Sequence, residues 1–185
     1  MNPIRVALGA LFTALLAAPV SAQVQRPGQV VEAPAEPAPA EDDFARQLIT
    51  AGDPGLILQV MQGLGYDATL TVDGIGDPMI EGRMSKSNYN LFFYGCTANR
   101  DCTFLLFVSF LDLPNGISTA LIDDWNENAL WGTAFRSEDG GDPMLSIPFN
   151  LFGGVTMLNF ADTLDWFRVT VERFERHAAG AAANP

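Results

Sequence analysis

The chain has 185 residues, of which 10 are Lys or Arg and 22 are Asp or Glu, so its formal net charge at pH 7 is −12. Such an excess of acidic groups opposes binding to polyanions, and no cluster of basic residues offsets it. Nucleic acid and anionic lipid surfaces are therefore excluded as partners.

The first 22 residues have the pattern of an export signal. Arg5 supplies a positive start, residues 6–18 are apolar apart from Gly and Thr, and Val20-Ser21-Ala22 places small residues where signal peptidase cleaves. The apolar run is too short to span a bilayer comfortably, and no second run follows it. We expect a signal peptide over 1–22, cleavage after Ala22, a periplasmic or secreted mature protein and no stable membrane anchor.

Composition divides the remaining chain into three parts. Residues 23–41 are rich in Pro and Ala without an aromatic side chain, which predicts a disordered linker. Residues 42–178 have the length of one ordinary domain. Residues 179–185, AGAAANP, are expected to form a disordered tail.

The domain opens with a helix and two strands. Asp53 has the chemistry of an N-cap, Pro54 suits the first helical position, and apolar residues follow at helical spacing as far as Leu64. Residues 66–72 alternate between apolar and polar, and a turn rich in Gly and Asp leads to a second strand over 79–84.

The strongest strand signals lie over residues 88–95 and 103–111, which are rich in Phe and Leu. Both segments are apolar on both faces, which is typical of central strands in a sheet covered on both sides. A helix is expected from Ile117 to Ala129, then a hairpin of strands over 131–137 and 144–150.

A third helix is expected from a cap near Asp162 to about His177. The order of elements predicts an α+β domain, with an antiparallel sheet of about five to six strands flanked by three helices.

Cys96 and Cys102 stand at the tip of the hairpin between the two strongest strands. In an exported protein, two cysteines brought together by flanking strands predict a disulfide, which stabilises by about 2 kcal/mol in the chain-entropy model. A redox pair is the weaker alternative, because the spacing is not Cys-x-x-Cys. Metal binding is weaker still, because the chain has one His.

Catalytic signals are missing from the sequence. His177, the only histidine, falls in the last turn of a predicted helix, where a surface residue facing the helix dipole is the usual interpretation. Asp73 with Asp77, and Asp139 with Asp142, lie in turns without the pattern of a calcium-binding loop. No phosphate-binding or nucleophile motif is present, so we assign no catalytic, cofactor-binding or metal residue and expect no enzyme.

From Leu48 onward the chain resembles the YbjN family, whose members are described as candidate bacterial regulators of sensory transduction. The residues that carry the resemblance are Leu48-Ile49, Asp53-Pro54, Gly65-Tyr66, Gly76-Asp77-Pro78, Phe92-Phe93-Tyr94-Gly95-Cys96, Asp101-Cys102, Asp124-Trp125-Asn126, Asp165-Trp166 and Phe174. The resemblance implies a fold similar to that of type III secretion chaperones and supplies no active-site residues.

Together these features favour an exported, non-enzymatic interaction module of the bacterial envelope, with a chaperone-like or regulatory role. Its expected partner is an unidentified protein or a second copy of the chain, as a homodimer. Two alternatives stay open at this point. A small-molecule sensor requires a concave apolar pocket, and a carboxylate-based envelope hydrolase requires two acidic groups converging in a cleft.

Overall fold

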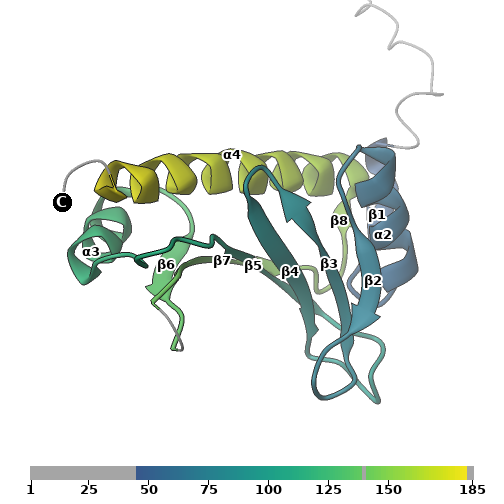
Figure 1. Cartoon of the computed structure of the whole chain (residues 1–185). Helices are drawn as coiled ribbons and strands as arrows, with labels where there is room; N and C mark the ends of the chain where they lie inside the picture. Colours follow the sequence, from purple (N-terminus) through teal and green to yellow (C-terminus); the bar gives the residue numbers. More distant parts are fainter. Residues whose placement is uncertain (1–44, 139–140, 183–185) are drawn as a thin grey trace, which may run out of the picture. The chain divides into compact units, whose positions relative to one another are not determined.

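The computed structural model describes residues 45–138 and 141–182. The expected export signal (1–22) and linker (23–41) lie outside these ranges, as do residues 183–185 of the expected tail. Within the described ranges, a six-stranded antiparallel sheet, a two-stranded sheet and three helices form the domain (Figure 1). The predicted α+β class, with about six antiparallel strands and three helices, is confirmed.

The six-stranded sheet has the strand order β2-β3-β4-β5-β7-β6. Its strands are β2 (Thr69–Val72), β3 (Pro78–Met84), β4 (Ser87–Tyr94), β5 (Phe104–Phe110), β6 (Thr133–Arg136) and β7 (Pro143–Asn150). The small sheet pairs β1 (Leu48–Ile49) with β8 (Val155–Thr156), and the helices are α2 (Pro54–Gly63), α3 (Thr119–Asn128) and α4 (Met157–Ala182). None of the helices in the described part of the chain is long and apolar enough to cross a membrane.

Helix α2 begins where its sequence predicts. The Oδ1 atom of Asp53 accepts a hydrogen bond from the backbone N–H of Leu56 at 2.9 Å, and Pro54 occupies the first helical turn. The helix buries Ile57 and Met61 against the sheet, because these two residues are four apart and share one helical face.

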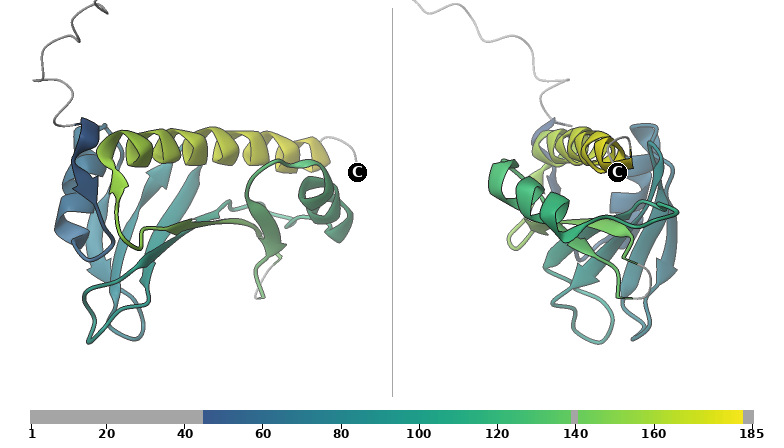
Figure 2. Two further views of the ribbon diagram at one scale, coloured as in Figure 1. Left: turned by 180° about the vertical axis from the view of Figure 1, so that it is seen from behind. Right: turned by 60° about the vertical axis from the view of Figure 1, so that its left-hand side comes forward.

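The main core lies between α4 and one face of the sheet, which we call the inner face. Alternate residues of β4 and β5 point to this face, and Leu91, Phe93 and Phe107 are fully buried there. Figure 2 shows α4 running along this side of the sheet. The ring of Phe167 in α4 lies 4.3 Å from the ring of Phe107, measured between centroids. Strands β4 and β5 therefore occupy the central position that their composition predicts.

The prediction that both faces of this sheet are covered is wrong. All three helices lie on the inner side of the sheet (Figures 1 and 2). The apolar residues of β4 and β5 that alternate with the inner ones are partly exposed, with the exception of the buried Val108. Those side chains shield one another only in part. Composition alone does not reveal this arrangement, because apolar residues on both faces are equally compatible with a second covering layer or with an exposed surface.

Helix α4 is longer than predicted at both ends. It starts at Met157 instead of near Asp162, because the Oγ1 atom of Thr156 accepts a hydrogen bond from the N–H of Asn159 at 3.2 Å. It also continues over residues 179–182 of the expected tail. Alanine has the highest helix propensity of all residues, which favours this continuation.

Candidate functional site

The second face of the six-stranded sheet, the outer apolar face, is the first candidate site. Strand pairing places its residues side by side: Phe92 lies opposite Leu106, which in turn lies opposite Pro148 on β7. The outer apolar face comprises Met79, Phe92, Tyr94, Phe104, Leu106, Val108, Phe110, Phe135, Met144 and Pro148. It therefore extends over five adjacent strands, from β3 to β6.

The two faces of the sheet differ clearly in exposure. On β4, Leu91 and Phe93 of the inner face are fully buried, whereas Tyr94 of the outer face is 40% exposed and Phe92 is half-exposed. The Tyr94 ring lies 6.2 Å from both the Phe92 and the Phe104 rings, so these aromatic side chains shield one another in part. A contiguous apolar patch of this kind is typical of an interaction surface on a folded domain.

The structure joins Cys96 and Cys102 in a disulfide at the end of the β4–β5 hairpin, with the sulfur atoms 2.09 Å apart. Thr97 and Arg100 inside the loop exchange two backbone hydrogen bonds, and Cys102 is buried. The two strands that supply most of the outer apolar face are thus held together at one end by a covalent link. Because a one-residue slip would turn each side chain to the opposite face, this link protects the register of the face.

Helix α3 closes one edge of the sheet through its Asp124-Trp125-Asn126 segment. The Asn126 amide donates to the carbonyl oxygen of Ala134 at 2.9 Å, and its Oδ1 accepts from the Ala134 N–H at 2.8 Å. Asn126 therefore satisfies the exposed edge of β6 as a neighbouring strand would. The Trp125 indole donates to the carbonyl oxygen of Gly132 at 3.1 Å, which fixes the entry into the same strand.

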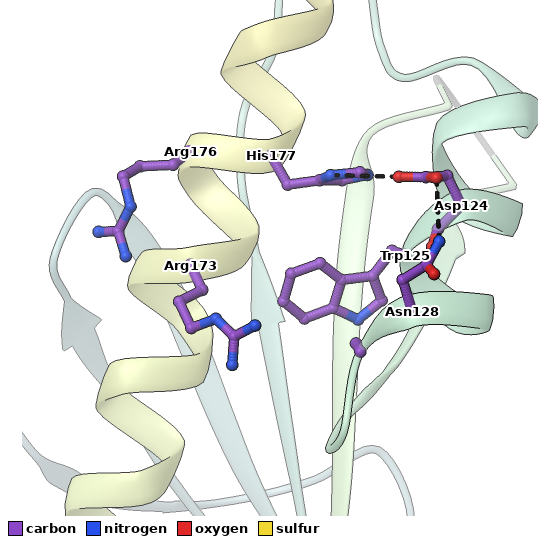
Figure 3. Close-up of a pocket in the computed structure, with 7 residues that line it drawn as sticks. Asp124, Trp125, Asn128, Arg173, Arg176 and His177 are labelled. Atoms are coloured by element: carbon purple, nitrogen blue, oxygen red, sulfur yellow. Dashed lines mark hydrogen bonds and ion pairs between the residues drawn. The ribbon is translucent and has the colours of Figure 1, made fainter.

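A pocket of about 280 Å³ lies between α3 and α4 (Figure 3). It is lined by Asp124, Trp125, Asn128, Ala129, Arg173, Arg176 and His177. His177, expected on the surface, is instead half-buried, and its Nε2 atom lies 2.8 Å from the carbonyl oxygen of Leu121. The sequence missed this contact because the two residues are 56 positions apart.

Of the acidic residues in the predicted turns, Asp73 bonds within its own turn, whereas the Asp142 carboxylate faces another segment. The Oδ1 atom of Asp73 accepts hydrogen bonds from the N–H groups of Ile75 and Asp77, each at 2.9 Å. The Oδ1 atom of Asp142 lies 3.5 Å from the Leu113 N–H, and Asp139 lies outside the described residues. Among residues 45–138 and 141–182, no group of three His, Cys, Asp or Glu side chains is arranged to hold a metal ion.

Tyr89 and Glu175 are two of the buried polar groups in the core, and each has structural partners. The Tyr89 hydroxyl donates to the carbonyl oxygen of Asp67 at 2.6 Å. Burial raises the pKa of Tyr89, and the Asp67 carboxylate raises it further, so the phenol stays neutral. Gly82 permits this crossing, because a Cβ there would overlap the Asp67 carbonyl oxygen.

The second group is Glu175 of α4, whose carboxylate reaches the turn between β3 and β4. It accepts hydrogen bonds from the hydroxyls of Ser85 and Ser87 and from the N–H of Lys86, at 2.7 to 2.8 Å. Glu175 is 6% exposed, and its contact with the buried Ser87 hydroxyl is sheltered from water, whereas Ser85 and Lys86 lie in the exposed turn. These partners give the carboxylate a role in holding α4 on the sheet.

Comparison with protein families gives one match. The model of the YbjN family, described as "Putative bacterial sensory transduction regulator", matches residues 53–179, from the cap of α2 to the last turns of α4. No curated protein and no solved structure matches the chain. The family description is that of a regulator and names no enzymatic activity. Because the match covers most of the chain and the whole six-stranded sheet, this protein belongs to the YbjN family.

Proposed function

We propose that this protein is a non-enzymatic regulatory module of the bacterial envelope that binds a protein partner through its outer apolar face. The observation that carries the proposal is the partial exposure of aromatic and aliphatic side chains such as Phe92, Tyr94 and Leu106 on one face of the sheet, whereas their neighbours on the other face of β4 and β5 are buried. The description of the family as a regulator of sensory transduction supports a role exerted through binding.

The composition of the outer apolar face suits a protein surface as its ligand. Phe, Tyr and Met are enriched in the buried centres of protein–protein interfaces, and the face presents Phe92, Tyr94, Phe104, Phe110 and Met144 on adjacent strands. Aromatic side chains held by neighbouring strands lose little conformational freedom on binding. A partner with a flat or convex apolar surface therefore fits this face better than a small molecule, which requires a concavity.

Charge distinguishes between a different protein and a second copy as the partner. The formal net charge of −12 means that a second copy would bring the same excess of acidic groups to the contact. Long-range repulsion slows and weakens such self-association, whereas basic groups around an apolar patch are attracted. We propose a different protein that presents an apolar patch flanked by Lys and Arg, and we expect the mature chain to sediment as a monomer.

The location is part of the proposal. Two features support export: the signal-like pattern of residues 1–22 and the joined pair Cys96 and Cys102, since disulfides persist in oxidising compartments. A partner in the periplasm or at the outer surface follows from this location.

The proposal is tested by capture of proteins from a periplasmic extract with three forms of the mature chain. Leu106→Asn places a polar group in the middle of the outer apolar face, where the side chain is half-exposed. Phe152→Asn is the matched control, because Phe152 is an apolar residue in the turn after β7 and is 79% exposed. A central interface residue contributes at least about 2 kcal/mol, or about thirtyfold in affinity.

We expect one set of proteins to be retained by the wild type and by Phe152→Asn, and to be lost with Leu106→Asn. The melting temperature of Leu106→Asn should stay within a few degrees of the wild type, since the residue is not in the core. Equal retention by both variants, or no specific retention by the wild type, would contradict the proposal. A stable dimer in sedimentation would contradict the choice of a different protein as partner.

A further inference from the structure

We infer that the pocket between α3 and α4 is a binding site for a small organic carboxylate that carries an apolar group. The pocket has a volume of about 280 Å³ and combines cationic side chains from α4 with an aromatic and an amide side chain from α3 (Figure 3). It is separate from the outer apolar face, so this inference does not depend on the proposed function.

Positive charge is concentrated at this pocket in an otherwise acidic protein. The chain has 22 acidic and 10 basic residues, and two of those basic residues, Arg173 and Arg176, line the same pocket one helical turn apart. Within the described part of the chain, neither guanidinium forms a hydrogen bond or an ion pair. By contrast, the neighbouring Arg168 is held by Asp165 and Glu172, each at 2.7 Å. The donors of both guanidinium groups are therefore free of protein acceptors among the described residues. Figure 3 shows Arg173 directed towards Trp125 and Arg176 extending on the other side of α4, so Arg173 is the group placed to bind an anion in the pocket.

The wall opposite the arginines is held in place before any ligand arrives. Trp125 is 5% exposed, and its ring packs 5.0 Å from that of Phe174 and 5.5 Å from that of His177, measured between centroids. The Asn128 amide donates to the Asp124 carboxylate at 3.1 Å and to the Asp124 carbonyl oxygen at 3.0 Å. Fixed walls reduce the entropy that binding costs, which is what a small ligand needs to be retained.

The mixed charge of the pocket determines the class of anion. A guanidinium fork matches the geometry of a planar carboxylate and binds it through two parallel hydrogen bonds. Asp124 lies on the opposite wall, with its Oδ2 atom 3.8 Å from Nδ1 of His177. Its negative charge repels a second negative charge on the ligand. Among the lining residues, Arg173 and Arg176 exceed Asp124 by one positive charge, and only Arg173 is directed towards Trp125. This charge suits a monoanion better than a phosphate dianion.

The apolar part of the ligand has its own place in the pocket. Ala129 and Trp125 supply the apolar part of the lining. The Trp125 indole projects from α3 towards α4 and lies next to Arg173 (Figure 3). A carboxylate on a small aromatic or branched aliphatic group can pair with arginine and also contact the apolar part of the lining. Acetate can pair with arginine but offers little apolar surface.

The inference is tested by titrating the isotope-labelled mature chain with sodium benzoate, sodium acetate and sodium phosphate at constant ionic strength. Backbone amide resonances of residues 124–129 and 173–177 report on the pocket. We expect benzoate to shift them saturably with a dissociation constant of about 1 mM, the value that the size of this ligand allows. Acetate and phosphate should bind at least about tenfold more weakly.

The variant Arg173→Gln should raise the dissociation constant for benzoate at least about tenfold, because it removes a charge-assisted pair of hydrogen bonds. Arg100→Gln is the matched control: Arg100 is exposed at the tip of the β4–β5 hairpin and its removal lowers the net charge equally. It should leave the constant within about twofold. Since both side chains are exposed, neither variant should change the melting temperature noticeably.

Shifts that do not saturate, or an equal effect of both substitutions, would show that anions are attracted non-specifically by surface charge. Either result would overturn the inference. Tighter binding of phosphate than of benzoate would overturn the choice of a carboxylate. Saturation confined to residues of the outer apolar face would overturn the choice of this pocket.

Discussion

Replacing Glu175 is expected to release the middle of α4 from the turn between β3 and β4. The Glu175 carboxylate accepts three hydrogen bonds from this turn, one from each of Ser85, Lys86 and Ser87. Ser87 is 1% exposed, so in Glu175→Ala its hydroxyl loses its partner with no access to water. Ser85 also has a φ of 58°, an uncommon conformation for a residue other than Gly, which the contact helps to retain.

The magnitude follows from these contacts. A buried donor left without a partner costs about 1–3 kcal/mol, and the Ser87 hydroxyl is such a donor. The Ser85 hydroxyl and the Lys86 N–H lie in the exposed turn, where water can replace the carboxylate. The loss of stability is partly offset, because folding of the variant no longer transfers a carboxylate from water into the protein. We expect Glu175→Ala to lower the free energy of unfolding by about 2 kcal/mol, which corresponds to a melting temperature about 7 °C lower for a domain of this size.

Urea unfolding followed by circular dichroism measures the effect, with Glu172→Ala as the matched control. Glu172 lies in the same helix and pairs with Arg168 at 2.7 Å, but its side chain is 35% exposed. A surface ion pair of this kind contributes about 0.5 kcal/mol or less. If Glu175→Ala is no more destabilising than Glu172→Ala, the carboxylate does not hold the turn. Double variants with Ser87→Ala should be clearly non-additive, because both changes remove the same contact.

Two further predictions concern the core and the hairpin. Burial raises the pKa of Tyr89. Above a pH of about 10 the unfolded state releases the phenolic proton, whereas the folded state keeps it. The free energy of unfolding should therefore fall by about 1.4 kcal/mol per pH unit above that point. This alkaline fall should be clearly shallower in Tyr89→Phe, measured by urea unfolding between pH 8 and 11; a smaller fall remains because burial also raises the pKa of Tyr66. A wild type with the same profile as the variant would refute the assignment. Native protein should contain no titratable thiol, and replacing Cys96 and Cys102 by Ser should lower stability by about 2 kcal/mol without abolishing the fold. Two freely reacting thiols in protein from an oxidising compartment would reopen a redox or metal role.

The parts of the fold that the sequence predicted well are those specified by residues close together in the chain. Asp53 and Pro54 mark the start of α2 because capping involves the next three residues only. The central strands β4 and β5 are predictable because each contains a run of apolar side chains, residues 91–94 in β4 and residues 104–108 in β5. The family resemblance rested on the same core and turn residues.

The parts that the sequence missed depend on contacts between distant residues. In the sequence Glu175 resembles any other acidic residue on a helix, because its partner Ser87 is 88 positions away. Asn126 has no visible role until β6 lies beside it, and the start of α4 depends on Thr156 in a strand of two residues. The exposure of one sheet face depends on where the helices pack, and this packing cannot be predicted from the pattern of residues within a short segment.

The central claim, that the outer apolar face is a protein-binding surface, is tested most directly by site-specific photocrosslinking in living cells. A photoreactive phenylalanine analogue is placed at position 106, in the middle of the face, and separately at position 152, in the exposed turn after β7. Both substituted proteins must first match the wild type in melting temperature. The account predicts a discrete crosslinked product from position 106, formed with a protein other than a second copy of the chain, and none from position 152. The absence of a product from position 106, or the same product from both positions, would contradict it.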